Sequence, residues 1–376
     1  MRQTDGEGAR RGVLTGARTV VVKLGTGVLT GPTGGVDRGV WGALVDELAA
    51  LAETRQVVVV SSGAIALGVE ALGLASRPKA MDALQACAAV GQGVLIARWA
   101  EGFARHHRVV AQVLLTHADL ASRKRWLNAR RALAELVRRG AIAVINENDT
   151  VSFEEIAFGD NDNLSAQVAN LCQADALVML SVAPGLLDGD RVVPCVAPGD
   201  RAVDALIHRG TSAGGTGGMA SKVAAARAAT EVGCAAVIAP GKRPGVLGAL
   251  FDGEDVGTVF LPGTTRKASR DHWIAHTLRP RGVVTVDRGA RDAVRAGRSL
   301  LPSGITAVRG GFGEGDAVDL EGPGGELFAR GLVAVSAQDL EKIRGRRTQE
   351  VPSLLGYDPG AEVLHADDLV LLGVPS

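Results

Sequence analysis

Short apolar runs alternate with longer stretches of helical periodicity along the first two thirds of the chain. The runs are rich in Val and Ile and are apolar at consecutive positions, as in strands that are buried on both faces. The predicted strands are Thr19–Leu24, Val57–Ser61, Val109–Leu115, Ala141–Asn146, Ala176–Ser181 and Ala235–Ala239. The predicted helices are Gly39–Glu53, Ala64–Leu72, Met81–His106, Arg125–Arg139, Leu164–Cys172 and Ser221–Val232. This order predicts an α/β fold, a mainly parallel sheet sandwiched by helices.

The pattern changes after about Thr264. Residues 265–280 are predicted to be a charged linker, and residues 281–376 to form a small β-rich domain with Gly, Pro and Asp turns. Its predicted strands are Gly282–Val286, Gly304–Val308, Ala317–Leu320, Glu326–Val335 and Leu369–Leu372. Residues 18–264 then make the first domain. Residues 1–17 carry charges among glycines without an apolar run, so we expect a flexible tail there.

Composition excludes several classes of protein. The chain has 376 residues, of which 46% are hydrophobic and 22% charged, so we expect a folded globular protein and not a disordered chain. Basic and acidic residues number 41 each, which leaves no overall field to attract nucleic acid or an anionic membrane. The longest stretch without Asp, Glu, Lys or Arg, Ala83–Ala97, is too short to span a bilayer.

The four cysteines favour a reducing compartment. Cys87, Cys172, Cys195 and Cys234 are far apart and contain no CxxC pair. We therefore expect free thiols, no disulfide and no zinc site. Together with the missing apolar leader, this predicts a cytoplasmic protein.

Two loops at the carboxyl ends of predicted strands could bind an anion. Lys23 ends the first strand and is followed by Gly25 and Gly27, whose amide groups can approach a ligand closely. The alternative is a structural lysine that snorkels or meets an internal carboxylate. Ser61-Ser62-Gly63 stands directly before a predicted helix, where it could bind an anion or simply cap the helix.

Two further segments are dense in polar or glycine residues. Asn and Asp cluster at 146–149 and 159–163, where they could receive an ammonium group, a lysine or a hydrated magnesium ion. We expect Asp162 or Asn163 to cap the following helix. Residues 214–222, Gly-Gly-Thr-Gly-Gly-Met-Ala-Ser-Lys, match neither a dinucleotide-binding fold nor a Walker A loop, but could cradle a phosphate through backbone donors and Lys222.

The seven histidines lie outside these loops and have no metal-binding spacing, so we name no metal-ligating residue and expect catalysis to need no histidine. Phosphoryl transfer to a carboxylate fits this absence, because an ionised carboxylate needs no general base. Its main difficulty is to bring two anions together, which lysines, amide dipoles and Mg²⁺ relieve.

These segments together resemble the glutamate 5-kinase family. The matching motifs are Lys23–Thr30, Ser62-Gly63-Ala64-Ile65-Ala66, Ile145–Thr150, Gly159–Ala166 and Gly215–Lys222. In the second domain, Gly331–Ser336, Ile343–Gly345 and Leu355-Gly356-Tyr357 resemble the PUA domain of many of these kinases. The resemblance implies an amino-acid-kinase fold, ATP and Mg²⁺, and formation of L-glutamyl 5-phosphate as the first step of proline synthesis. It also implies homo-oligomers and feedback by L-proline.

The resemblance also implies roles for individual residues. Glutamate would be held by Ser62 with Gly63, Asp149 and Asn161; Lys23 and Lys222 would contact the phosphates; and Asp160 would orient the lysines. The nucleotide would be covered by Thr216, Gly217, Gly218, Met219, Ala220, Ser221 and Lys222.

One segment departs from the family pattern. Ser181-Val182 stands where the family usually has Thr-Asp, and Val182 has no carboxylate to offer the nucleotide. We therefore expect Ser181 and backbone groups to hold the nucleoside, with weaker discrimination of base or ribose.

Two alternatives remain open. Aspartate or N-acetylglutamate kinases could share the fold and phosphate loops. An RNA-binding role of the second domain is disfavoured, because residues 281–376 carry 11 basic and 14 acidic side chains. The basic cluster of Lys342, Arg344, Arg346 and Arg347 is more simply explained as a solvated helix face.

Overall fold

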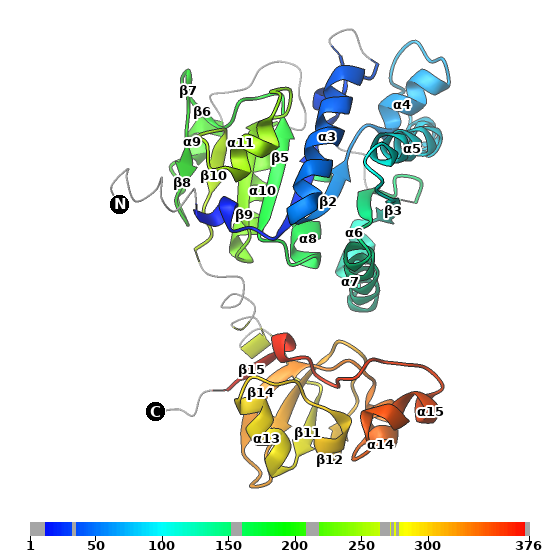
Figure 1. The fold of residues 1–376 in the computed structure, drawn as a ribbon, viewed down its shortest axis with the longest axis vertical. Coiled ribbons are helices and arrows are strands. Elements are labelled where there is room, and N and C mark those ends of the chain that lie inside the picture. The colour runs from blue at the N-terminus through cyan, green and yellow to red at the C-terminus, as the bar shows by residue number, and fades with distance from the viewer. Residues whose placement is uncertain are drawn as a thin grey trace. The chain divides into compact units, whose positions relative to one another are not determined.

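The structure is a computed structural model that describes residues 12–31, 35–151, 160–207, 218–263, 271, 274–275 and 278–372, apart from the side chains of Arg123, Lys124 and Asp160. It divides into two compact units, Met1–Arg266 and Lys267–Ser376 (Figure 1). The division falls within the segment 265–280 that the sequence predicts as a linker.

The first unit is built on an eight-stranded sheet in the order β3-β4-β2-β1-β5-β9-β10-β8. The strands are β1 (Thr19–Leu24), β2 (Gln56–Ser61), β3 (Val110–Leu115), β4 (Ile142–Glu147), β5 (Ala176–Ser181), β8 (Cys195–Val196), β9 (Ala235–Pro240) and β10 (Thr258–Phe260). All neighbours from β3 to β9 pair in parallel, and β10 runs antiparallel to β9. The mainly parallel sheet is therefore confirmed. The pattern missed β8 and β10, which are too short to give a periodic signal.

Helices cover both faces of this sheet (Figure 1). One apolar cluster includes residues of α3 (Arg38–Thr54), α4 (Ala64–Ala71), α5 (Met81–Ala104) and α11 (Val246–Phe251). The other includes residues of α7 (Arg123–Arg138), α8 (Asp160–Leu171) and α10 (Met219–Glu231). Along β1, Val20, Val22 and Leu24 join the first cluster and Val21 the second. Since side chains alternate along a strand, Lys23 shares the face of α8 and α10.

Smaller elements complete the first unit. They are α2 (Thr26–Leu29), α6 (His117–Ala121), α9 (Asp204–Ile207) and the hairpin of β6 (Leu187–Asp188) and β7 (Arg191–Val192). The predicted tail 1–17 is too long, because residues 12–15 are helical and Leu14 and Ala17 are buried in the core. Isolated apolar residues among glycines gave no periodic signal there. Of the described helices, none is both long and apolar enough to cross a membrane.

The second unit has its own five-stranded sheet, in the order β12-β11-β13-β14-β15. The strands are β11 (Gly282–Val286), β12 (Ile305–Gly310), β13 (Ala317–Glu321), β14 (Leu327–Leu332) and β15 (Leu369–Leu371). The predicted β-rich domain is confirmed, with the addition of α13 (Arg288–Arg295), α14 (Ala337–Ile343) and α15 (Val351–Leu355). In the basic cluster, Lys342 pairs with Asp339 and Arg344 with Glu341.

Candidate active site

The parallel strands bring the predicted loops to one edge of the sheet. β1, β2, β4 and β5 run in the same direction, so the segments that follow them all leave from their carboxyl ends. Ligands bind at this edge in open α/β sheets. The polar residues at this edge are Lys23, Ser181 and those around Ser62 and Asn146. The first turn of α8 contacts several of them, and the first turn of α10 contacts α8.

Lys23, Asp162 and Lys222 form a buried ion cluster. Lys23 Nζ lies 2.6 Å from Asp162 Oδ1, and Lys222 Nζ lies 3.0 Å from Asp162 Oδ2. Ser221 Oγ donates a hydrogen bond of 2.7 Å to the same Oδ2. The side chains come from β1, α8 and α10, and all three charged residues are buried. The fold therefore brings together two lysines that are 199 positions apart in the sequence.

One carboxylate faces two ammonium groups, and the pKa values of both Lys23 and Asp162 are lowered. Burial lowers the pKa of Lys23; Asp162 partly offsets the effect, and the charge of Lys222 adds to it. Burial by itself would raise the pKa of Asp162, but the two lysines and the hydrogen bonds from Lys23 and Ser221 outweigh it, so the pKa is lowered. Lys23 does meet an internal carboxylate. Because Lys222 shares it, the cluster with both lysines protonated keeps a net positive charge.

The carboxylate that contacts both lysines in the structure is that of Asp162. The role of holding both lysines, expected of Asp160 by resemblance, belongs in the structure to Asp162. The side chain of Asp160 lies outside the described residues, so its own role is untested. The expectation that Asp162 or Asn163 caps the helix is wrong, since α8 begins at Asp160. A carboxylate in the first helical turn is favoured by the helix dipole in any case.

A chain of side-chain amides lies beside the ion cluster. Asn161 Nδ2 donates to Ser62 Oγ at 2.9 Å and to Asn146 Oδ1 at 3.0 Å. Asn146 Nδ2 donates in turn to Gln92 Oε1 at 2.8 Å. The structure thus unites the predicted Ser62 and Asn161. It adds Gln92, which sequence reasoning missed because a single polar residue within an Ala-rich helix gives no signal.

The serines of the second loop do not cap the helix that follows them. The N-cap of α4 is Gly63, with φ of +112°, so this cap supplies no side-chain hydrogen bond to the amides of the first turn. Ser61 Oγ accepts a hydrogen bond from Trp99 Nε1, and Ser62 Oγ accepts one from Asn161. Simple N-capping, the alternative for this loop, is therefore not what the structure contains. The amide groups at the start of α4 stay available to an anion.

Three other predicted site residues, Asp149, Ser181 and Val182, belong to neither the ion cluster nor the amide chain. Asp149 is half-buried and its charge raises the pKa of Arg77, against the larger lowering by burial. Ser181 is buried and accepts a hydrogen bond from the amide of Ala183. Val182 is 67% exposed, and a methyl group at Gly27 would lie 3.3 Å from its Cγ1. Val182 therefore forms an apolar surface beside the start of α2.

The glycine-rich segment is described only in part. Gly218 is the N-cap of α10 in an extended conformation, and Met219, Ala220, Ser221 and Lys222 form the first turn. Thr216 and Gly217, predicted to contact the nucleotide, lie outside the described residues. In the described turn, the helix amino terminus and Lys222 provide the positive end of a dipole and a point charge.

Within the described part of the chain, no three His, Cys, Asp or Glu side chains are grouped as a metal site requires. The four cysteines are free, and burial raises the pKa of the Cys172 thiol to about 12. A thiol with that pKa stays protonated near neutral pH and is a poor nucleophile.

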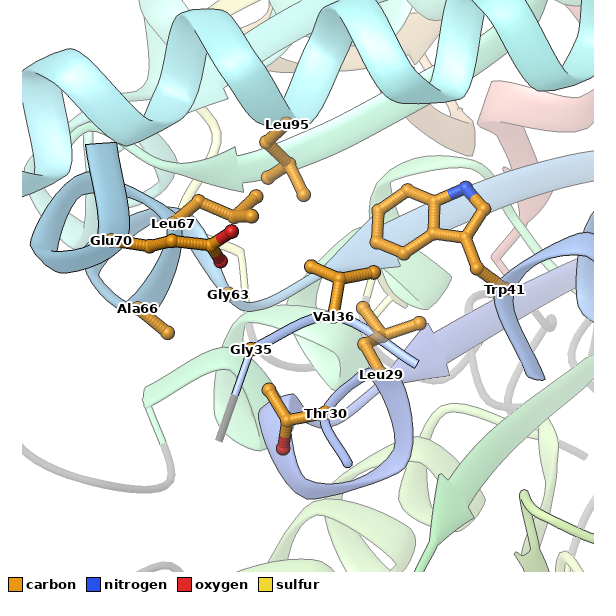
Figure 2. A pocket seen from close by; sticks show the side chains of 10 residues that line it. All are labelled: Leu29, Thr30, Gly35, Val36, Trp41, Gly63, Ala66, Leu67, Glu70 and Leu95. Carbon is orange, nitrogen blue, oxygen red and sulfur yellow. The ribbon is translucent and has the colours of Figure 1, made fainter. Parts of the chain in front are cut away.

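A small cavity touches the site at Gly63. Its volume is about 20 Å³, and its lining is mostly apolar, with Glu70 and Trp41 at opposite ends (Figure 2). That volume holds about one water molecule and not an amino acid. This cavity is therefore too small to be the site of an amino-acid substrate.

Comparison with known proteins agrees with this geometry. The model of the amino acid kinase family matches residues 18–240, and that of the PUA domain matches residues 282–355. Glutamate 5-kinase of Myxococcus xanthus is 50% identical over 96% of this chain and 98% of its own length. The glutamate 5-kinases of Trichlorobacter lovleyi and Geobacter sulfurreducens are 46% and 44% identical over 96% of this chain, and over 99% and 100% of their own lengths.

We predict that Asp162→Asn moves the alkaline limit of activity to lower pH. Asp162 raises the pKa of Lys23, so its neutralisation lets Lys23 lose its proton at a lower pH. The measurement is a profile of kcat/KM against pH from 6 to 10 for both proteins. Turnover at neutral pH should also fall by about two orders of magnitude, because the lysines lose their shared anchor.

Circular dichroism of the variant controls for folding. The matched control is Asp204→Asn, at a carboxylate that forms a partly exposed ion pair with Arg227. An alkaline limit that stays in place, or moves to higher pH, contradicts the assigned coupling.

Proposed function

The chain belongs to the amino acid kinase family and, through relatives that match nearly its whole length, to the glutamate 5-kinases. From this membership and from the site we propose that it transfers the terminal phosphoryl group of ATP to the side-chain carboxylate of L-glutamate. The product is L-glutamyl 5-phosphate, the first intermediate of proline synthesis.

The ion cluster of Lys23, Asp162 and Lys222 is the observation that carries this proposal. A carboxylate and a nucleoside triphosphate are both anions, and their approach is the main barrier to reaction. Two buried ammonium groups on one carboxylate offset the repulsion, and burial strengthens their effect on charge that develops during transfer. Asp162 fixes both groups before the substrates arrive, so little reorganisation is needed.

The residues at the sheet edge supply the rest of the proposed mechanism. Glutamate is held by Ser62, Gly63, Asn161 and Asp149. The carboxylate of Asp149 would pair with the ammonium group of glutamate, and the amides at the start of α4 would bind an anionic group. Lys23 and Lys222 contact the phosphates as these pass between the substrates. No side chain has to remove a proton, because the attacking carboxylate is already ionised near neutral pH.

The nucleotide is proposed to bind at the start of α10, over residues 216–222, with Ser181 and Val182 beside the nucleoside. When Mg²⁺ is bound with the nucleotide, it would supply positive charge that offsets the charge of the phosphates. Such ions keep several waters and need only one or two protein carboxylates.

Three further properties remain predictions. The free cysteines and the use of ATP favour a cytoplasmic location. Homo-oligomers and inhibition by L-proline are expected from the family. We assign no nucleic acid to the second unit.

The direct test is an ATP-dependent hydroxamate assay, in which hydroxylamine traps the acyl phosphate. We expect product with L-glutamate and at least tenfold less with L-aspartate or N-acetyl-L-glutamate at equal concentration. A preference for either of the other two acceptors would assign the chain to a neighbouring activity. Absence of product with all three would remove the proposal.

A second prediction concerns the nucleotide. Val182 offers an exposed apolar surface where a carboxylate could otherwise bind ribose or base, so we expect GTP and CTP to support the reaction within about tenfold of ATP. The measurement is kcat/KM for each nucleotide at saturating glutamate. Val182→Asp should sharpen the preference for one of them, and strict use of ATP by the unchanged protein contradicts the idea.

A further inference from the structure

The amide chain from Ser62 to Gln92 ends on a helix whose position is tightly fixed. Gly91, next to Gln92, touches the first turn of α4, where a methyl group would lie 1.7 Å from the carbonyl oxygen of Ala64. Gly68 makes the reciprocal contact with the carbonyl of Cys87 on α5. Since α4 begins directly after Gly63, α5 and the Ser62 loop are held together by backbone contact. Gln92 therefore sits at a fixed place relative to the loop.

Each amide in the chain has a donor end and an acceptor end, so the chain can run in two directions. In the observed direction Asn161 uses both hydrogens of its Nδ2, one to Ser62 Oγ and one to Asn146 Oδ1. Ser62 is an acceptor in this arrangement, and its own hydroxyl proton stays free. That proton can be donated to a bound carboxylate.

In the reverse direction the chemistry of Ser62 changes. Gln92 would donate to Asn146, Asn146 would donate to Asn161 Oδ1, and the Ser62 hydroxyl would donate to that same oxygen. Only lone pairs would then face the substrate, and they would repel its carboxylate. Both directions contain three hydrogen bonds within the chain, so the group at its end decides between them.

In the observed direction, one polar atom of Asn161 and one of Gln92 take no part in the hydrogen bonds of the chain. Among the described residues, Asn161 Oδ1 and Gln92 Nε2 are buried without a hydrogen-bond partner. If Gln92 lost its oxygen, Asn146 Nδ2 would become a further buried donor without a partner. An unpaired buried N–H group is costly, and reversal would only move that cost to the Nδ2 of Asn161, which would lose both of its acceptors. Without the Gln92 oxygen, the amides of Asn146 and Asn161 would therefore not be held in either direction.

We propose that Gln92 is a positioning residue whose side-chain oxygen anchors Asn146, and through it Asn161, in the arrangement that leaves the Ser62 hydroxyl free to donate to the glutamate carboxylate. This inference rests on the proposed function. It adds to that function a residue on a helix that supplies no group to the ion cluster, and it gives a role to the side-chain hydrogen bond between α5 and β4.

The test compares Gln92→Met with Gln92→Glu at pH 8. Methionine is close in size but cannot accept the hydrogen bond from Asn146, whereas an ionised glutamate can only accept it and so fixes the observed direction. We expect the KM for glutamate to rise about tenfold or more in Gln92→Met and to stay within about threefold of the unchanged protein in Gln92→Glu. The KM for ATP should change by less than about twofold in both.

A role in packing alone predicts the opposite order, because a buried charge is tolerated less well than an apolar side chain of similar size. Gln112→Met and Gln112→Glu, at an exposed position of the edge strand β3, are the matched controls and should leave both KM values unchanged. The inference is overturned if Glu is worse than Met, if neither variant changes the KM for glutamate, or if both substrates are affected equally. Failure of the unchanged protein to phosphorylate glutamate would instead remove the proposed function, and this inference with it.

Discussion

The attraction of one buried carboxylate for two ammonium groups is the interaction on which the account of this site depends. Asp162 is fully buried, and a lone charge there would be strongly destabilising. Lys23 and Lys222 compensate it, and in doing so they are fixed at the sheet edge with an excess of positive charge. A site that must receive two anions benefits from that excess. The same groups therefore contribute to the integrity of the first unit and to its proposed chemistry.

The fold makes this cluster through ordinary features of a parallel sheet. Alternation along β1 directs Lys23 to the face covered by α8 and α10, while its neighbours in register, Val60 and Met179, lie in the apolar cluster of that face. The first turn of each helix then carries its charged residue to the carboxyl end of the strands. On the other face, α5 reaches the same edge through hydrogen bonds to Ser61 and Asn146. Elements from both faces of the sheet thus contribute polar groups to this edge.

Much of the fold could be predicted from the sequence, because buried strands and amphipathic helices leave strong patterns. Lys23, Ser62 and Lys222 could be found as polar residues at strand ends or helix starts, and the structure joins them to one site. The acid that holds both lysines, Asp162, could not be singled out, because Asp160 and Asp162 stand in one polar run and the contacts of Asp162 depend on how α8 packs against β1 and α10. Gln92 could not be found either. Its importance comes from hydrogen bonds across 54 positions of sequence, and no local pattern encodes these.

The most direct measurement of the central claim is the turnover of Lys222→Ala at saturating ATP and glutamate. Asp162 keeps Lys23 as its partner in this variant, so the protein should fold with its melting temperature little changed, while kcat falls by about two to three orders of magnitude. Lys342→Ala, which removes an exposed lysine of the second unit, should leave kcat unchanged. If Lys222→Ala folds normally and keeps its turnover within a few-fold, charge held by Asp162 does not drive the transfer and the account of the site is wrong.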